Sequence, residues 1–294
     1  MSNLLQRIIF AVIAIPVVLY IVLYKPLGFF TLTVLLSGIT VWEYYGLAKT
    51  KGYSPQVGLG IFLTMCTAMI FGIERFTFGY GSNISQTAHE IVISIAGLSA
   101  IIILASDLFR SLPNPIEQSA ITLFGPIYIG IGCGSLFGLF DLIARNPLIA
   151  GSDKFTPGYF VIVLLISIWV CDSAAYFVGK AFGKHKLFER VSPNKTWEGS
   201  IAGFICCVVV WVLVPKIFPE LIALKTSNTL IIGIVVGNVG QLGDLAKSLL
   251  KRDAGVKDSS NLIPGHGGFL DRLDSIMFSA PILYAVLNII STLQ

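Results

Sequence analysis

The residues whose types and spacing best suit chemistry lie near the C-terminus, between Ser248 and Asp274. Eight of these 27 residues are charged, whereas only 12% of the whole chain is charged. Asp271 and Asp274 are three positions apart, so an expected final helix would carry both carboxylates on one face. Asp244 precedes them on the helix before. Hard oxygen ligands of this kind suit Mg²⁺, which prefers one or two carboxylates together with substrate phosphates.

Basic side chains accompany these carboxylates. The spacing of four polar residues predicts one polar stripe along a helix. Counted from Asp244, they are Lys247 at i+3, Ser248 at i+4 and Lys251 at i+7. Such cations can neutralise the part of the phosphate charge that a metal ion does not neutralise. A zinc site is disfavoured, because only His266 offers a nitrogen ligand nearby. The alternative is an internal salt-bridge network of the kind that a transporter uses.

Two further polar segments lie within otherwise apolar sequence. Asp172 and Tyr176 fall on one helical face, where the carboxylate either contacts metal or substrate or pairs with a basic loop residue. The segment Ser192–Gly199 has the composition of a helix start. Its Lys195 and Thr196 would stand where free N–H groups and the helix dipole favour anions, which predicts phosphate contact.

The elements that must position these residues are membrane-spanning helices. With 55% hydrophobic residues and a mean hydropathy of +0.83, the chain has too little charge to cover a water-facing surface. Runs of about 20 apolar residues, the length that spans a bilayer, occur in nine places. They are residues 5–24, 27–47, 56–73, 90–107, 119–143, 157–179, 198–219, 228–250 and 267–292. We expect an all-α polytopic membrane protein forming one domain, 1–294, with spans of mainly structural role in 1–150 and the catalytic site in 157–294.

Lysine and arginine indicate the orientation of these spans. An N-terminus in the cytoplasm would put 14 of the 20 Lys and Arg residues on the cytoplasmic side, with the C-terminus on the opposite side. The polar end of the second predicted span, Trp42–Tyr45, is interpreted as an interfacial aromatic belt. No basic stripe with interleaved aromatic residues occurs in the sequence, so nucleic acid is not an expected partner.

The stretch from Ser248 to Asp274 resembles a known signature. Its matching parts are Ser248-Leu249-Leu250-Lys251-Arg252, then Lys257-Asp258, then His266-Gly267-Gly268-Phe269-Leu270-Asp271-Arg272-Leu273-Asp274. In these residues the chain resembles the CDP-diacylglycerol synthases, also called phosphatidate cytidylyltransferases. The segment Ser192–Gly199 and the surroundings of Asp172 also resemble features of that family.

The resemblance implies that CTP and phosphatidic acid condense to CDP-diacylglycerol and pyrophosphate and that the reaction requires Mg²⁺. Whether a second metal or a monovalent cation also takes part is left open. It implies a multi-pass protein of the inner membrane whose site faces the cytoplasm, with a homodimer left open. We expect the metal to be held by Asp244, Asp271 and Asp274. The other expected catalytic residues are Lys251, Arg252, Lys257, Asp258, His266 and Arg272. The expected substrate-binding residues are Asp172, Tyr176, Asn194, Lys195, Thr196, Glu198, Ser248, Gly267 and Gly268.

Two other functions stay open on the sequence alone. A CTP-dependent kinase of polyprenols or other lipids would also use Asp, Lys and Gly near the cytoplasmic side. An ion-coupled transporter would place charged groups near the middle of the membrane, often in inverted repeats. Here the charges gather at one side and no repeat is visible.

Overall fold

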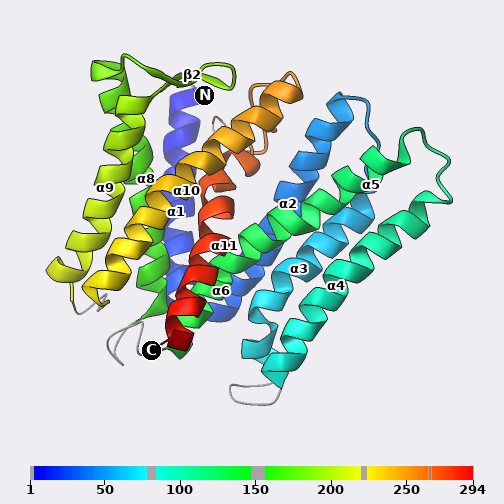
Figure 1. The fold of residues 1–294 in the computed structure, drawn as a ribbon, viewed down its shortest axis with the longest axis horizontal. Coiled ribbons are helices and arrows are strands. Elements are labelled where there is room, and N and C mark those ends of the chain that lie inside the picture. Colours follow the sequence, from blue (N-terminus) through cyan, green and yellow to red (C-terminus); the bar gives the residue numbers. More distant parts are fainter. Residues whose placement is uncertain are drawn as a thin grey trace. The chain divides into compact units, whose positions relative to one another are not determined.

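The structure is a computed structural model, which describes residues 3–77, 84–146, 156–219, 224–263, 265 and 267–293. Within these residues the chain is almost entirely helical (Figure 1). The helices are α1 (Asn3–Tyr24), α2 (Pro26–Thr50), α3 (Val57–Thr77), α4 (Ile84–Asp107), α5 (Pro115–Phe124), η1 (Gly125–Gly130), α6 (Ile131–Arg145), α8 (Pro157–Phe182), α9 (Trp197–Ile217), α10 (Thr226–Asp253) and α11 (Leu270–Leu293).

Each of the nine predicted apolar segments falls on one of these helices, with α5, η1 and α6 together forming the fifth. Six helical stretches in the described residues are long and apolar enough to span a membrane: Pro26–Thr50, Pro115–Arg145, Pro157–Phe182, Trp197–Ile217, Thr226–Asp253 and Leu270–Thr292. Three shorter apolar helices, Val12–Tyr24, Val57–Ile73 and Gly97–Asp107, correspond to the first, third and fourth segments. The prediction of an all-α polytopic membrane protein is therefore confirmed.

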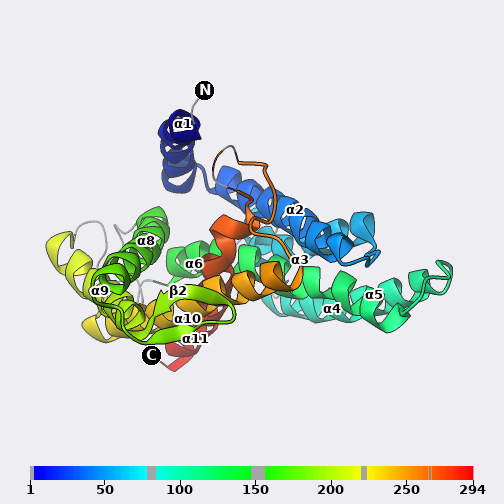
Figure 2. The same cartoon turned by 90° about the horizontal axis from the view of Figure 1, so that it is seen from above.

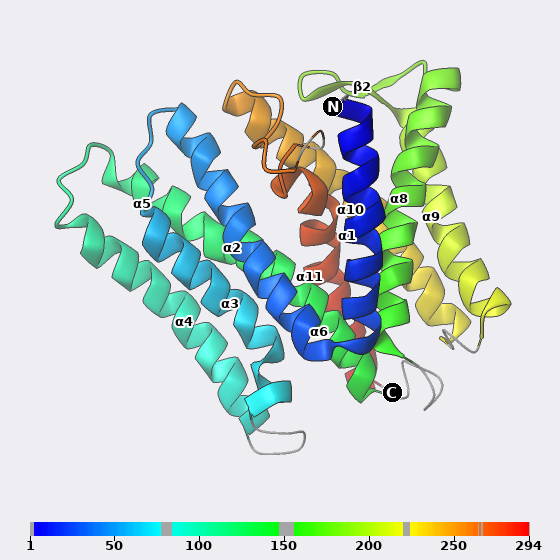
Figure 3. The same cartoon turned by 180° about the vertical axis from the view of Figure 1, so that it is seen from behind.

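The chain forms two compact units. Unit 1 comprises Met1–Ile21, Lys25–Gly138 and Leu250–Leu273, and unit 2 comprises Val22–Tyr24, Leu139–Leu249 and Asp274–Gln294. In unit 1, α2, α3 and α4 lie side by side (Figure 3). Buried aromatic residues fill the space between helices, and the Tyr45 hydroxyl donates a 2.6 Å hydrogen bond to the Thr122 carbonyl.

The fifth predicted segment is not a regular α-helix. Its middle six residues, η1, form a π-helix that contains Pro126. Proline has no backbone N–H and its ring clashes with the preceding turn, so the hydrogen-bond ladder must be rearranged at this point. The hydropathy pattern predicts the length of such a segment, but not this local widening.

Unit 2 is held together by close approach of helices at small residues. Gly203 of α9 lies against α8, where an added Cβ would come within 2.7 Å of the Cys171 carbonyl oxygen. Gly237 of α10 lies in the same way against α9, near Phe204 and Cys207. Small residues permit such contacts between membrane helices, for which apolar burial supplies no driving force.

The substitution Gly203→Ala is expected to destabilise the protein by about 1–3 kcal/mol, because the new methyl group meets backbone that cannot move independently. Thermal unfolding in detergent measures the effect. The matched control is Gly46→Ala on α2, where an added Cβ meets nothing within 4 Å. Equal stability of the two variants would show that α8 and α9 are not packed this closely.

A short antiparallel hairpin joins α8 to α9 in unit 2. Its strands are β1 (Lys186–Phe188) and β2 (Ser192–Thr196), and it lies at the ends of the two helices (Figure 2). Thr196 ends β2 and caps α9, since its hydroxyl accepts a 3.2 Å hydrogen bond from the Gly199 N–H. The predicted helix start is thus confirmed, whereas the two strands in the loop between segments 157–179 and 198–219 are not predicted.

Candidate active site

Unit 2 contains a cavity of about 520 Å³ that gathers most of the predicted substrate-binding residues. Among its lining residues are six of the predicted site residues, namely Asp172, Tyr176, Asn194, Lys195, Thr196 and Asp244. The volume lies within the range of small-molecule sites. Residues from α8, β2 and α10, far apart in the sequence, are therefore brought to one place.

Helix α8 supplies one wall of the cavity. Asp172, Tyr176 and Lys180 follow one another at intervals of four residues, so they share a helical face. Lys180 and Lys186 line the cavity but are absent from the predicted set. For Lys180 the signal was present, because its spacing from Tyr176 places it on the face of Asp172. For Lys186 no local signal exists in the sequence, because its position depends on the unpredicted hairpin.

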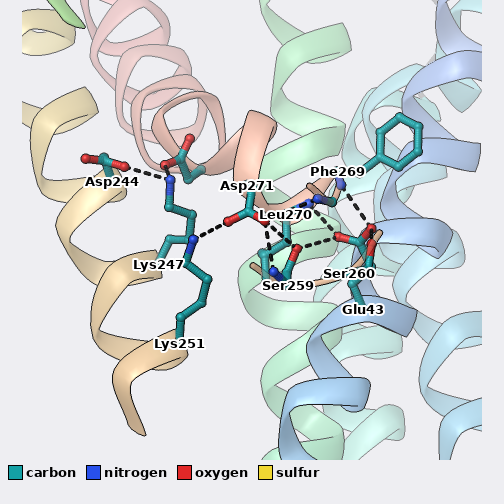
Figure 4. Close-up of polar contacts among 11 residues, drawn as sticks. Glu43, Asp244, Lys247, Lys251, Ser259, Ser260, Phe269, Leu270 and Asp271 are labelled. Atoms are coloured by element: carbon teal, nitrogen blue, oxygen red, sulfur yellow. Dashed lines mark hydrogen bonds and ion pairs between the residues drawn. The ribbon is translucent and has the colours of Figure 1, made fainter. Parts of the chain in front are cut away.

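The polar stripe predicted on α10 is confirmed and extends to two other elements of unit 2. Asp244 accepts from Lys247 Nζ at 2.7 Å (Figure 4). Its other oxygen lies 2.5 Å from Lys195 Nζ. Lys247 Nζ also lies 2.5 Å from an oxygen of Asp274. Lys247 and Asp274 are only 8% and 6% exposed, so these charges depend on one another. Two carboxylates thus converge on a single buried ammonium group.

A second cluster lies within unit 1, around Asp271. One oxygen of its carboxylate lies 2.5 Å from Lys251 Nζ (Figure 4). The other oxygen accepts from the backbone N–H groups of Ser259 and Gly268, at 2.9 and 3.2 Å, and lies 3.0 Å from the Ser259 hydroxyl. The signature stretch therefore folds back so that its loop binds its own aspartate.

Glycine is required at Gly267 because its φ is +80°, in the left-handed region that other residues rarely adopt. Gly267 directly precedes Gly268, whose backbone N–H donates to the Asp271 carboxylate. The prediction that the Asn261–Gly268 segment makes a tight turn is supported by an isolated bridge between Ile263 and Gly267. His266, a predicted catalytic residue, lies outside the described residues.

Glu43 was missed as a site residue. The interpretation of Trp42–Tyr45 as an aromatic belt is wrong for Glu43, Tyr44 and Tyr45, which are buried in unit 1. The Glu43 carboxylate accepts hydrogen bonds from Ser259, Ser260, Phe269 and Leu270. The available signal was a lone ionisable residue within an apolar segment, which is costly unless it has a partner.

Other predicted residues have the following surroundings or exposure. Glu198 instead binds the loop before β1, with its carboxylate 2.6 Å from His185 Nδ1 and accepting from the Lys184 N–H at 3.1 Å. Ser248 is half-buried on α10. Exposed side chains are found at Arg252, Lys257, Asp258 and Arg272.

The chemistry of the donors fits the implied magnesium ion. Asp244 and Asp274 place carboxylate oxygens around one ammonium group, that of Lys247. Carboxylate oxygen is the donor that Mg²⁺ prefers. Among the described residues, no group of three or more acidic, histidine or cysteine side chains is arranged to hold a metal. The three-aspartate metal site therefore stays a prediction.

Comparison with known proteins identifies the family of the chain. The sequence profile of the Cytidylyltransferase family matches residues 5–290. The chain belongs to this family. The resemblance predicted from the signature stretch is thereby confirmed, and the match covers the N-terminal helices as well as the residues that carry the motif.

Relatives of the same family align with nearly the whole chain. A phosphatidate cytidylyltransferase of Bacillus subtilis is 32% identical over 99% of this chain and 100% of its own length. The protein of that name from Staphylococcus haemolyticus is also 32% identical, over 96% of this chain and 98% of its own length. The one from Haemophilus influenzae is 30% identical, over 94% and 96%.

Proposed function

We propose that this protein transfers the cytidylyl group of CTP to phosphatidic acid, giving CDP-diacylglycerol and pyrophosphate. Family membership supports the reaction, as do the names of the relatives. The single observation that carries the proposal is the unit 2 cavity, in which Lys180, Lys186 and Lys195 stand beside the N-terminus of α9. Three cations and a helix N-terminus suit a polyphosphate.

The reaction makes limited demands on the protein. The bond that forms joins a phosphatidate oxygen to the α-phosphorus of CTP, and the bond that breaks joins that phosphorus to the oxygen leading to the β-phosphate. The attacking oxygen is already anionic at neutral pH, so no strong general base is needed. The protein must instead align the two substrates and neutralise the departing pyrophosphate.

The residues of the chain divide these tasks in the following way. Lys180, Lys186 and Lys195 bind phosphate oxygens, and the α9 N-terminus contributes free N–H groups. Asp244, Asp271 and Asp274 hold Mg²⁺, with room in the proposal for a second metal or monovalent cation. The bound ion supplies neutralisation of phosphate charge. Lys251, Arg252, Lys257 and Arg272 bind the remaining phosphate groups, and Asp172 and Tyr176 contact substrate from α8.

The position in the membrane follows from the two substrates. Phosphatidate keeps its acyl chains in the bilayer, whereas CTP arrives from water, so the reaction belongs at an interface. We place nine spans in the inner membrane, with the N-terminus and the site on the cytoplasmic side and the C-terminus opposite. The excess of Lys and Arg in the loops on that side supports this orientation.

Radiolabelled CTP tests the reaction type with the purified protein. With phosphatidic acid and Mg²⁺, label at the α-phosphate is expected in the lipid product and label at the γ-phosphate in pyrophosphate. Transfer of the γ-label to lipid would instead identify a lipid kinase. Failure to transfer either label, together with ion-dependent uptake into vesicles, would favour a transporter.

The substitution Lys195→Ala is expected to lower kcat/KM for CTP by about 10–100-fold, the effect of losing a hydrogen bond from a charged donor. The matched control is Lys184→Ala, which removes an exposed lysine of the same connection whose side chain does not line the cavity. Steady-state kinetics with varied CTP measures both variants. Equal losses in the two would indicate a general charge effect and no specific phosphate contact.

A further inference from the structure

Glu43 is a buried carboxylate in the C-terminal third of α2, 1% exposed. It is separated in the sequence by more than 200 residues from every group shown to bind it. Its two oxygens accept from the Ser260 hydroxyl at 2.6 Å, the Leu270 N–H at 2.8 Å and the Phe269 N–H at 3.0 Å. The Ser259 hydroxyl lies 3.1 Å away (Figure 4). All of these residues belong to unit 1.

Two of these contacts fix the start of α11. The helix begins at Leu270, and the first N–H groups of a helix have no partner within it. Glu43 therefore serves as the N-terminal cap of α11, although it comes from another helix. A negative charge at this end is also favoured by the helix dipole. Asp271 is the second residue of α11, so its backbone is placed directly by this cap.

The other contacts fix the side chain of Asp271. The Ser259 hydroxyl stands between two carboxylates, 3.1 Å from Glu43 and 3.0 Å from Asp271. The Ser259 and Gly268 N–H groups bind the same Asp271 oxygen, which leaves the other oxygen facing Lys251. Orientation of the Asp271 carboxylate thus depends on a loop that Glu43 holds.

The loop packs so closely against Glu43 at Gly268 that there is no room for a side chain there. A Cβ at this position would overlap the Ser259 hydroxyl and both oxygens of Glu43. The glutamate cannot simply move aside, because its oxygens are bound to backbone N–H groups at the start of α11. Gly268 is accordingly required for close approach of the loop to Glu43.

We propose that Glu43 is a positioning residue of the cytidylyl transfer, which orients Asp271 by binding the Ser259–Ser260 loop and the first N–H groups of α11. This inference rests on the proposed function for its consequence in catalysis, but the positioning itself does not. It gives a residue of the second helix an indirect effect, through Asp271, on the chemistry of the C-terminal signature.

Kinetics of the Glu43→Gln variant test the inference. One carboxylate oxygen becomes an amide NH₂, which cannot accept from the loop, so kcat is expected to fall about 10–100-fold, the range for residues that orient metal ligands. The Mg²⁺ concentration for half-maximal activity is expected to rise, with little change in KM for CTP. Gly268→Ala is expected to have the same signature, because it disturbs the same contact from the loop side.

The matched control is Asp107→Asn. Asp107 is a carboxylate of unit 1 with a side chain that is 6% exposed, and it binds Gln56, Arg110 and Ser119, none of which belongs to the loop. This variant is expected to lose stability while keeping kcat per folded molecule and its Mg²⁺ dependence. Should Glu43→Gln behave like Asp107→Asn in these respects, a purely structural role for Glu43 would be established and the inference overturned.

Backbone hydrogen exchange separates failure of this inference from failure of the proposed function. Exchange at Ser259, Ser260 and Leu270 is expected to be faster in Glu43→Gln than in the parent protein, whatever reaction the protein performs. If exchange is faster in Glu43→Gln but the parent protein does not turn over CTP, the positioning role of Glu43 stands and the proposed reaction is rejected. Unchanged exchange in both Glu43→Gln and Gly268→Ala would reject the positioning.

Discussion

Replacing Asp274 or Asp271 by asparagine is expected to lower kcat by about 10²–10³-fold or more, the range for loss of one group that stabilises charge in a transition state. Asparagine keeps the size of the side chain but removes its charge, so the proposed magnesium site loses an anionic ligand. Release of pyrophosphate by purified variants measures the effect, and recovery of the protein from membranes shows that insertion is retained.

A matched control for these variants is Asp141→Asn. Asp141 is also buried, and it pairs at 2.8 Å with Arg145 on its own helix, away from the signature stretch in sequence. Its replacement is expected to reduce stability with little effect on kcat per folded molecule. Near-normal activity in both Asp271→Asn and Asp274→Asn would contradict the assignment of these carboxylates to the metal.

Replacing Lys247 by methionine is expected to destabilise the metal-free protein by about 3–5 kcal/mol, the cost of removing one partner from a buried ion pair. Methionine approximates the length of the lysine stem, so the change removes chiefly the ammonium group. Asp244 and Asp274 would then face each other without the cation that now lies 2.7 and 2.5 Å from them. Thermal unfolding in detergent with a chelator present measures the loss.

A double-mutant cycle supplies the control for Lys247→Met. Adding Asp274→Asn to Lys247→Met removes one of the two carboxylate charges that Lys247 neutralises, so the double variant is expected to be more stable than the sum of the single effects predicts. Mg²⁺ is also expected to raise the unfolding temperature of Lys247→Met more than that of the parent protein. Additive effects and no response to Mg²⁺ would show that Lys247 does not hold these two carboxylates together.

The helices and part of the site could be predicted because their signals are local in the sequence. A run of apolar residues long enough to span a bilayer is visible without knowledge of its neighbours, and all nine such runs coincide with helices. Thr196 was found as a helix start because capping depends on residues within one turn. The pairing of Asp244 with Lys247 follows from their spacing on one helix.

Features that depend on distant parts of the chain could not be predicted in this way. Glu43 has partners more than 200 positions away, so its own surroundings in the sequence suggest only an interfacial residue. The hairpin that brings Lys186 to the cavity consists of strands of three and five residues, too short for a periodic pattern. Glu198 is predicted to bind substrate, but its carboxylate lies against His185 of the preceding loop.

The most direct test of the central claim is the release of pyrophosphate by the purified protein supplied with CTP, phosphatidic acid and Mg²⁺. We expect one pyrophosphate for each CDP-diacylglycerol formed, and no release when phosphatidic acid, CTP or Mg²⁺ is omitted. Absence of pyrophosphate from protein that is folded and inserted in lipid, with all three present, would contradict the proposed cytidylyl transfer.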